Sequence, residues 1–197
     1  MRNLLAVLLV TAALLGAGGA VLYTGAAVGD DDEHEEHEKG RGGRDGAGEA
    51  RDFMPAMNAD YEKECGACHF AHPPGLLPER SWQKLMGGLD NHFGDDAELA
   101  PETQGAITQY LVANAAEHAN SRRAAKFLKG IGKDESPLRI TETRYFKRKH
   151  DEVPERMVVG NPKVKSFANC VTCHRSAEKG VFDDDDVRIP GFEREHF

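Results

Sequence analysis

Apolar residues recur at helical spacing through the middle of the chain. The clearest run begins at Pro78 and stops at Gly94. Its apolar positions follow the i, i+3, i+4, i+7 pattern that places side chains on one face of a helix. The residues on this face are Trp82, Leu85, Met86, Leu89 and Phe93, and His92 falls on the same side. The pattern predicts a helix that buries one apolar stripe and carries a histidine near its end.

Other runs predict further helices. Pro101 begins one, and the pair Asn120–Ser121 can cap another. Short helices are also predicted around the two cysteine pairs, within Asp60–His69 and within Ser166–Gly180. The stretch Ile140–His150 fits either a strand or a helix. No segment sustains the alternation of apolar and polar residues that a half-buried strand shows, so the predicted fold class is mainly α.

The first quarter of the chain differs in composition from the rest. Residues 1–29 begin with one positive charge and then carry none, which fits either a signal peptide or an N-terminal membrane anchor. Residues 30–52 are acidic and then glycine-rich, so they are predicted to form a flexible linker. The remainder is predicted to divide at a turn into two small domains, 53–133 and 134–197. Both interpretations of the first segment place these domains outside the cytoplasm.

All four cysteines lie in two copies of the pattern Cys-x-x-Cys-His. This spacing is typical of c-type haem attachment. Two thiols one helical turn apart add to the haem vinyl groups, and the adjacent imidazole can take one axial position on the iron. The copies are Cys65-Gly-Ala-Cys68-His69 and Cys170-Val-Thr-Cys173-His174. The sequence therefore predicts two covalently attached haem c groups, with His69 and His174 as proximal ligands.

Two other uses of paired cysteines fit this chain less well. A structural zinc site commonly takes two Cys-x-x-Cys units about 15–20 residues apart. Here about 100 residues separate the pairs, and both trailing histidines would be left without a role. A thioredoxin-like dithiol would require a βαβ pattern, which the sequence lacks.

The second axial ligand of the first haem is predicted to be a histidine. Methionine is the common alternative in cytochromes c, but Met86 lies on the apolar stripe and is interpreted as core. His92 is favoured because it projects from the most apolar predicted helix. The alternatives are His118, which has polar neighbours, and His72, which follows the motif closely and precedes two prolines. A histidine on an apolar face can also be an ordinary core residue.

The second haem has a similar choice of ligand. No methionine follows its attachment motif, and Met157 would have to reach back to it. His150 lies four residues after Phe146, so one helical turn would place the aromatic ring and the imidazole on one side. His196 is next to the C-terminus, where ordering a residue costs more. His150 is therefore favoured, and His196 is the alternative.

Two histidines on each iron would leave no position open for oxygen, peroxide or another substrate. Such a protein changes oxidation state without transforming a substrate, so no catalytic residues are predicted and the expected function is electron transfer. One alternative is a di-haem peroxidase-like enzyme, which requires a vacant iron position. Another is a subunit whose haems connect the centres of a membrane redox complex.

Charge is distributed unevenly around the formal net value of −8. Between Arg122 and Lys149, ten Lys or Arg residues stand against three acids. This basic stretch could pair with haem propionates, dock an acidic redox partner or form a solvated surface. Nucleic acid is not an expected partner, because aromatic residues are sparse in this stretch. Asp183–Asp186 lacks the spaced ligands of a calcium loop and is interpreted as solvated.

Several sequence blocks are distinctive beyond the haem motifs. They are Tyr61-x-x-Glu-Cys-Gly-x-Cys-His, Pro-Pro-Gly-Leu-Leu-Pro78, Ser81-Trp-x-x-Leu-Met86, His92-Phe-Gly94, Tyr110-Leu-x-x-Asn-Ala115 and Ile140-Thr-Glu-Thr-x-Tyr-Phe-x-Arg-Lys-His150. Together they resemble the bacterial di-haem cytochrome c family, abbreviated DHC, from about Asp60 to Pro190. The resemblance implies a periplasmic electron carrier with two low-potential, bis-histidine haems. It also implies an N-terminal half like a class I cytochrome c and a less regular C-terminal half.

Position by position, the resemblance implies His69 and His174 as proximal ligands and His92 and His150 as distal ones. It also implies redox protein partners. Family members can exchange electrons with a high-spin, oxygen-binding monohaem cytochrome c and with a membrane b-type cytochrome. The expected localisation is the periplasm, with the protein either soluble or tethered to the inner membrane through residues 4–29.

Overall fold

The computed structural model describes residues 51–192 of the 197-residue chain. The predicted leader, nearly all of the predicted linker and the alternative ligand His196 lie outside the described residues. The described residues all belong to one compact unit. Among them, no helix is both long enough and apolar enough to span a bilayer.

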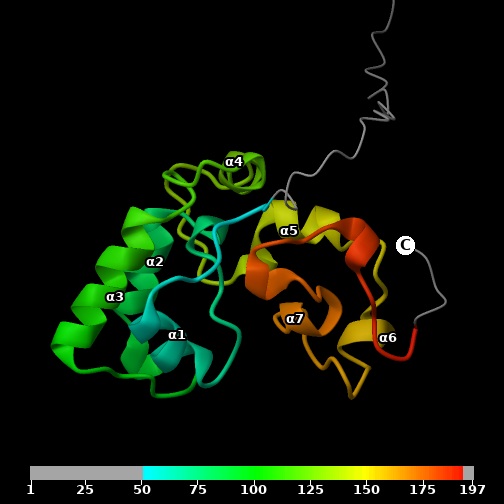
Figure 1. Ribbon diagram of the computed structural model, residues 1–197, viewed down its shortest axis with the longest axis horizontal. Coiled ribbons are helices and arrows are strands. Elements are labelled where there is room, and N and C mark those ends of the chain that lie inside the picture. The colour runs from blue at the N-terminus through cyan, green and yellow to red at the C-terminus, as the bar shows by residue number, and fades with distance from the viewer. Residues whose placement is uncertain (1–50, 193–197) are drawn as a thin grey trace, which may run out of the picture. The chain divides into compact units, whose positions relative to one another are not determined.

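Short helices and turns make up the regular structure of residues 51–192 (Figure 1). Only two isolated β-bridges occur in this range, so the predicted mainly α fold class is confirmed. The α-helices are α1 (Ala59–Gly66), α2 (Glu79–Met86), α3 (Pro101–Ala113), α4 (Arg122–Lys129), α5 (Arg144–Lys149), α6 (Glu155–Val158) and α7 (Cys170–Cys173). The 3-10 turns are η1 (Pro74–Leu76), η2 (Leu89–Asn91), η3 (Ile140–Glu142), η4 (Ala177–Lys179) and η5 (Asp184–Asp186).

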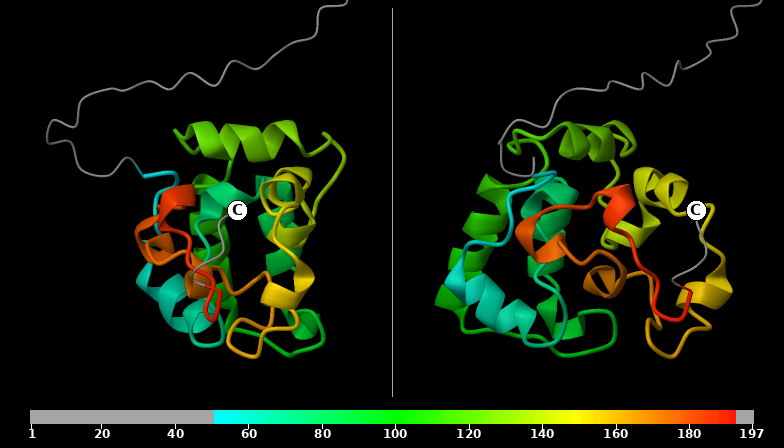
Figure 2. Two further views of the ribbon diagram at one scale, coloured as in Figure 1. Left: turned by 90° about the vertical axis from the view of Figure 1, so that its right-hand side faces the viewer. Right: turned by 45° about the vertical axis from the view of Figure 1, so that its right-hand side comes forward.

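Helices α2 and α3 pack side by side, as the views of Figures 1 and 2 both show. Pro101 begins α3, as predicted, because the first turn of a helix does not need its missing N–H. Ile107 and Leu111 of α3 are almost fully buried, in one cluster with Trp82 and Met86 of α2. The two predicted apolar stripes thus face each other and form the core of this part.

Helix α2 is shorter than predicted. It ends at Met86, and the chain continues through Gly87–Gly88 and η2. Phe93 then has a φ of 60°, in the left-handed region, and is 43% exposed. The prediction of one helix over Pro78–Gly94 with Phe93 on its buried face is therefore wrong. Two consecutive glycines, which have the lowest helix propensity after proline, end the helix early.

Helices α4 and α5 are in contact, and α4 lies beyond one end of the α2–α3 pair (Figure 2). Ser121 caps α4, as predicted, by accepting the backbone N–H of Ala124 at 3.1 Å. The ambiguous stretch Ile140–His150 forms η3 and α5. Thr143 separates these two elements and caps α5 by accepting the N–H of Phe146.

One aromatic cluster joins both sides of the predicted domain boundary, and we call it the middle core. It consists of Phe53, Leu76, Ala116, Ala124, Phe127, Tyr145 and Phe146. The Phe127 ring lies 4.7 Å from that of Tyr145, centre to centre. The division into domains at 53–133 and 134–197 stays a prediction, and the two parts share this core.

The first described residues are fastened to the segment that follows the second cysteine pair. Asp52 and Phe53 both donate their backbone N–H to the carbonyl of Gly180, at 2.9 and 3.0 Å. Phe182 donates its N–H to the Asp52 carboxylate at 2.8 Å. We call residues 51–53 and 180–182 the terminal clasp. Asp52, predicted to end the flexible linker, is thus part of the packed unit.

The helix predicted within Ser166–Gly180 is limited to α7. Ser166 does not cap it, because its hydroxyl accepts the N–H of Ala168 in a turn that precedes α7. His174 leaves the helix with extended backbone, since it forms an isolated antiparallel bridge with Val187. That pairing replaces the further helical turns that the sequence suggested.

Candidate functional site

The first cysteine pair lies at the end of α1. Asn58 caps the start of this helix by accepting the N–H of Tyr61 at 2.8 Å. Cys65 is half-buried against the α2–α3 core, Cys68 is exposed, and neither forms a disulfide. Burial, with a smaller contribution from the Glu64 carboxylate, raises the pKa of the Cys65 thiol to about 11. The sulfur atoms of Cys65 and Cys68 are thus both free of a disulfide bond.

His69 and His92 come together beside this pair. Their ring centres are 6.2 Å apart, with an angle of 20° between the ring planes. Two imidazole nitrogens bound to one metal from opposite sides, each about 2 Å from it, leave ring centres roughly 6 Å apart. The His69 Nδ1 donates to the carbonyl oxygen of Phe70 at 2.8 Å, which leaves Nε2 as the available lone pair. The spacing suits two axial ligands of one iron.

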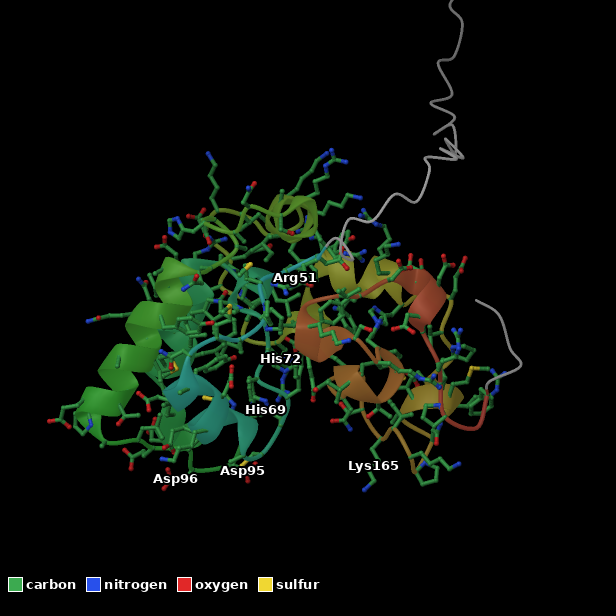
Figure 3. The ribbon with its side chains drawn as sticks, viewed as in Figure 1. Arg51, His69, His72, Asp95, Asp96 and Lys165 are labelled. Carbon is green, nitrogen blue, oxygen red and sulfur yellow. The ribbon has the colours of Figure 1, made fainter. Side chains whose placement is uncertain are left out.

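A third histidine, His72, lies next to this pair. Its ring centre is 5.3 Å from that of His69, and Figure 3 shows the two residues adjacent to each other. Its Nδ1 is buried without a hydrogen-bond partner, and burial lowers the pKa of His72 to about 4. At 5.3 Å the two rings are nearer than ligands on opposite sides of an iron would be, so the geometry favours His92. In the sequence, His72 is a candidate because it closely follows the first Cys-x-x-Cys-His motif.

His92 is positioned by a tight turn and not by the predicted helix. Its backbone N–H donates to the carbonyl of Asp95 at 2.7 Å, and the Asp95 N–H donates back at 3.3 Å. The guanidinium of Arg139 lies 3.8 Å from the centre of the neighbouring Phe93 ring. The pKa of His92 is lowered mainly by burial and, to a smaller extent, by interactions with His69 and Arg139. A lowered pKa favours the neutral imidazole, which is the form that binds a metal.

The other candidates for the first site lie elsewhere. His118 is exposed and pairs with the carboxylate of Glu79, so it does not approach His69. Met86 is 4% exposed within the α2–α3 core, as predicted.

His150 and His174 form the second pair. Their ring centres are 6.1 Å apart, with 74° between the ring planes. The His150 ring stacks on that of Phe146 at 3.9 Å, which confirms the predicted placement of both rings on one side of α5. The His150 Nδ1 donates to the carbonyl of Phe146 at 2.9 Å, so its Nε2 is available. Burial lowers the pKa of both imidazoles, to about 4 for His174.

Two aromatic residues near this pair were not anticipated. Phe167 lies edge-on to the His150 ring, and Phe182 lies 5.3 Å from the His174 ring. Both lie close to the second Cys-x-x-Cys-His motif in the sequence, and this closeness is the feature that could have indicated them. Cys170 and Cys173 form no disulfide, and burial raises the pKa of the Cys170 thiol to about 11. The second site thus combines two thiols that form no disulfide, two imidazoles and apolar walls.

The remaining alternatives do not assemble into sites. Met157 is fully buried in an apolar cluster with Val158, Val164 and Ile189. Within residues 51–192, no three His, Cys, Asp or Glu side chains gather as they would around a metal ion.

The geometry of both sites fits haem c, and a comparison with known families is decisive. The model of the dihaem cytochrome c family, DHC, matches residues 61–182. The chain belongs to the dihaem cytochrome c family. As a dihaem cytochrome c, it is an electron-transfer haem protein with two covalently attached haem c groups. The match spans both Cys-x-x-Cys-His motifs.

Solved dihaem cytochromes c are similar to this chain over most of the described residues. A diheme cytochrome c from Shewanella baltica OS155 is 47% identical, and the match covers 70% of this chain and 96% of that one with a TM-score of 0.58. A diheme cytochrome c from Rhodobacter sphaeroides is also 47% identical, with 66% and 99% coverage and a TM-score of 0.59. The search of curated proteins gave no match.

Proposed function

We propose that this dihaem cytochrome c carries electrons in the periplasm through two six-coordinate, bis-histidine haems and is not an enzyme. The observation that carries the proposal is the partner imidazole near each motif histidine, at 6.2 Å in the first pair and 6.1 Å in the second. The proposed axial pairs are His69 with His92 and His174 with His150. If both axial positions of an iron are occupied, no substrate can bind to it.

When bound, each haem supplies a one-electron couple, and the chain's own residues hold and shield it. Cys65, Cys68, Cys170 and Cys173 would form the thioether bonds. Carbonyl oxygens fix the ring orientation of one histidine in each pair and raise its basicity. Two imidazoles, without a methionine, favour a low reduction potential.

The proposed localisation and partners are supported by sequence and family resemblance. The uncharged segment of residues 4–29 supports export, either with cleavage or as a tether. The proposed partners are a high-spin, oxygen-binding monohaem cytochrome c and a membrane b-type cytochrome. We also propose two haem-binding parts, 53–133 and 134–197, the first like a class I cytochrome c.

Low-temperature EPR of the oxidised holoprotein tests the ligand assignment. We expect His92→Ala and His150→Ala each to convert one low-spin haem to high-spin, because each removes one axial nitrogen. His118→Ala is the matched control, since this exposed histidine pairs with Glu79, and both haems should stay low-spin. A high-spin signal from His72→Ala, with His92→Ala unchanged, would assign His72 as the first distal ligand and contradict our choice.

Carbon monoxide separates a carrier from a di-haem peroxidase-like enzyme. The reduced holoprotein should keep its spectrum under carbon monoxide, because neither iron has an open position. Rapid carbon monoxide binding at one haem would contradict the proposal.

A further inference from the structure

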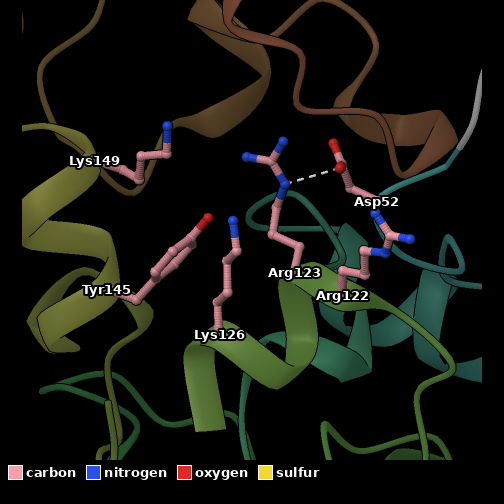
Figure 4. Close-up of a pocket in the computed structure, with 6 residues that line it drawn as sticks. All are labelled: Asp52, Arg122, Arg123, Lys126, Tyr145 and Lys149. Atoms are coloured by element: carbon pink, nitrogen blue, oxygen red, sulfur yellow. Dashed lines mark ion pairs between the residues drawn. The ribbon is translucent and has the colours of Figure 1, made fainter. Parts of the chain in front are cut away.

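A pocket between α4 and α5 gathers positive charge beside the second histidine pair. Its volume is about 180 Å³. It is lined by Asp52, Arg122, Arg123, Lys126, Tyr145 and Lys149, and we call it the basic pocket (Figure 4). Four of these six residues are cations.

The basic pocket has more cations than acids to neutralise them. Arg123 pairs with Asp52 at 2.8 Å, and Lys149 pairs with Asp184 at 3.1 Å. Neither Arg122 nor Lys126 forms an ion pair with any described acid. Uncompensated cations around a recess favour an anionic occupant.

The basic pocket adjoins the proposed second haem site. Lys149 immediately precedes the proposed ligand His150. Arg123 pairs with Asp52, and the Asp52 carboxylate accepts the backbone N–H of Phe182. The Phe182 ring lies 5.3 Å from the ring of the proposed ligand His174. In Figure 4 the side chains of Arg123, Lys126 and Tyr145 extend toward the same space.

We infer that the basic pocket binds the propionate carboxylates of the second haem and that its cations set the reduction potential of that haem. This inference rests on the proposed ligation of the second haem by His150 and His174. Attachment through the vinyl groups leaves two propionates per haem, and carboxylates in a partly buried place require cationic or N–H donors.

The inner part of the basic pocket is formed by Arg123, Asp52 and Tyr145, whereas Arg122, Lys126 and Lys149 are exposed at its rim. The side chains of Arg123 and Asp52 are only 24% and 21% exposed, and Tyr145 is 5% exposed. Asp52 is itself held by the Phe182 N–H in the terminal clasp, so the Arg123 guanidinium is fixed before any ligand arrives.

The expected direction of the effect follows from charge. Reduction adds one electron to the iron and makes the haem more negative by one charge. A nearby cation therefore stabilises the reduced form more than the oxidised form. Removing cations from the basic pocket should lower the potential of the second haem and leave that of the first haem nearly unchanged.

Optical redox titration of the full-length holoprotein tests the inference. The second haem is identified as the one that His150→Ala converts to high-spin. The double variant Arg123→Gln, Lys126→Gln should reduce its equilibrium constant for reduction about tenfold, a shift of about 59 mV for one electron. Lys126→Gln alone should give part of this shift, and because Lys126 is exposed the variant should fold normally. Arg123→Lys alone, which keeps the charge, should leave the reduction potential of the second haem close to that of the unmodified protein.

The matched control is Lys129→Gln, an exposed cation of the same helix outside the basic pocket. It should change the reduction potential of neither haem by more than a small fraction of that shift. Unchanged potentials in the double variant, with low-spin EPR intact, would overturn the inference. Unchanged potentials together with slower oxidation by ferricyanide would also overturn it, because the pocket would then serve external anions. Failure of the proposed ligation would instead appear as a high-spin haem in the unmodified protein.

Discussion

At Gly180 the backbone adopts a φ of 76°, and the residue is buried under the carbonyl oxygen of Phe53. A Cβ at this position would overlap that oxygen. The position of Phe53 therefore depends on a glycine at position 180, close to the end of the described residues.

We expect Gly180→Ala to lower the free energy of unfolding by more than about 2 kcal/mol. The substitution combines left-handed strain of about 1–2 kcal/mol with displacement of the Phe53 carbonyl. Gly191→Ala is the control, since Gly191 has a φ of 87° but no atom lies within 4 Å of the place that a methyl group would take. It should cost only the strain. Urea unfolding of both variants measures the difference, and equal losses would show that the overlap is relieved without cost.

The contact between Arg139 and Phe93 stabilises the turn that positions His92. Replacing Arg139 by Gln should remove a cation–π contact of about 0.5–1 kcal/mol. The first haem should then show a high-spin fraction at a lower temperature than in the unmodified protein. Temperature-dependent absorption spectra measure this, with Arg144→Gln, an exposed cation paired with Glu135, as the control. Identical onset in both variants would mean that the turn holds without Arg139.

The attachment residues could be predicted from sequence, whereas the environment of the ligands could not. Spacing alone defines a Cys-x-x-Cys-His motif, and the i, i+4 relation placed His150 over Phe146. The position of His92 depends instead on a turn whose partner, Arg139, is 46 residues away from Phe93. No local pattern encodes a contact of that kind.

Among the elements, helices with clear start signals were predictable. Pro101 is the first residue of α3, where its missing N–H costs nothing. Ser121 caps the start of α4 with its side-chain oxygen. The end of α2 was misplaced because an apolar stripe continued through Gly87–Gly88, and the low helix propensity of glycine decided the outcome. Periodicity shows which face is buried better than it shows where a helix ends.

Helix α3 contains an exposed glycine that nothing in its surroundings requires. Gly105 lies mid-helix, and a methyl group there would meet no atom within 4 Å. Gly105→Ala should raise the free energy of unfolding by about 1 kcal/mol. Ala106→Gly, at the neighbouring exposed position, should lower it by a similar amount. Urea unfolding measures both, and a loss of stability in Gly105→Ala would reveal an unrecognised contact.

For the whole molecule, we expect the middle core to make the two proposed haem-binding parts depend on each other. Phe127 is 5% exposed and contacts Phe53 and Tyr145, which lie on either side of it in the sequence. Phe127→Ala should destabilise the holoprotein by about 3–5 kcal/mol. Both haem spectra should change in one coincident transition.

The control for this variant is Val164→Ala, in the apolar cluster of the C-terminal part. It should cost less, because fewer buried carbons are removed. Two separate transitions in Phe127→Ala, with the first haem unaffected, would show that the parts fold independently and that the boundary near residue 133 is a true domain boundary.

The terminal clasp also affects how the protein is made. A ribosome adds about 5–20 residues per second, so roughly 6–25 seconds pass between the synthesis of Phe53 and that of Gly180. Throughout that interval Phe53 lacks the carbonyl to which it finally donates. Both cysteine pairs have been translated before the clasp can close. The first described residues therefore find their final partners only after both haem-attachment motifs have been made.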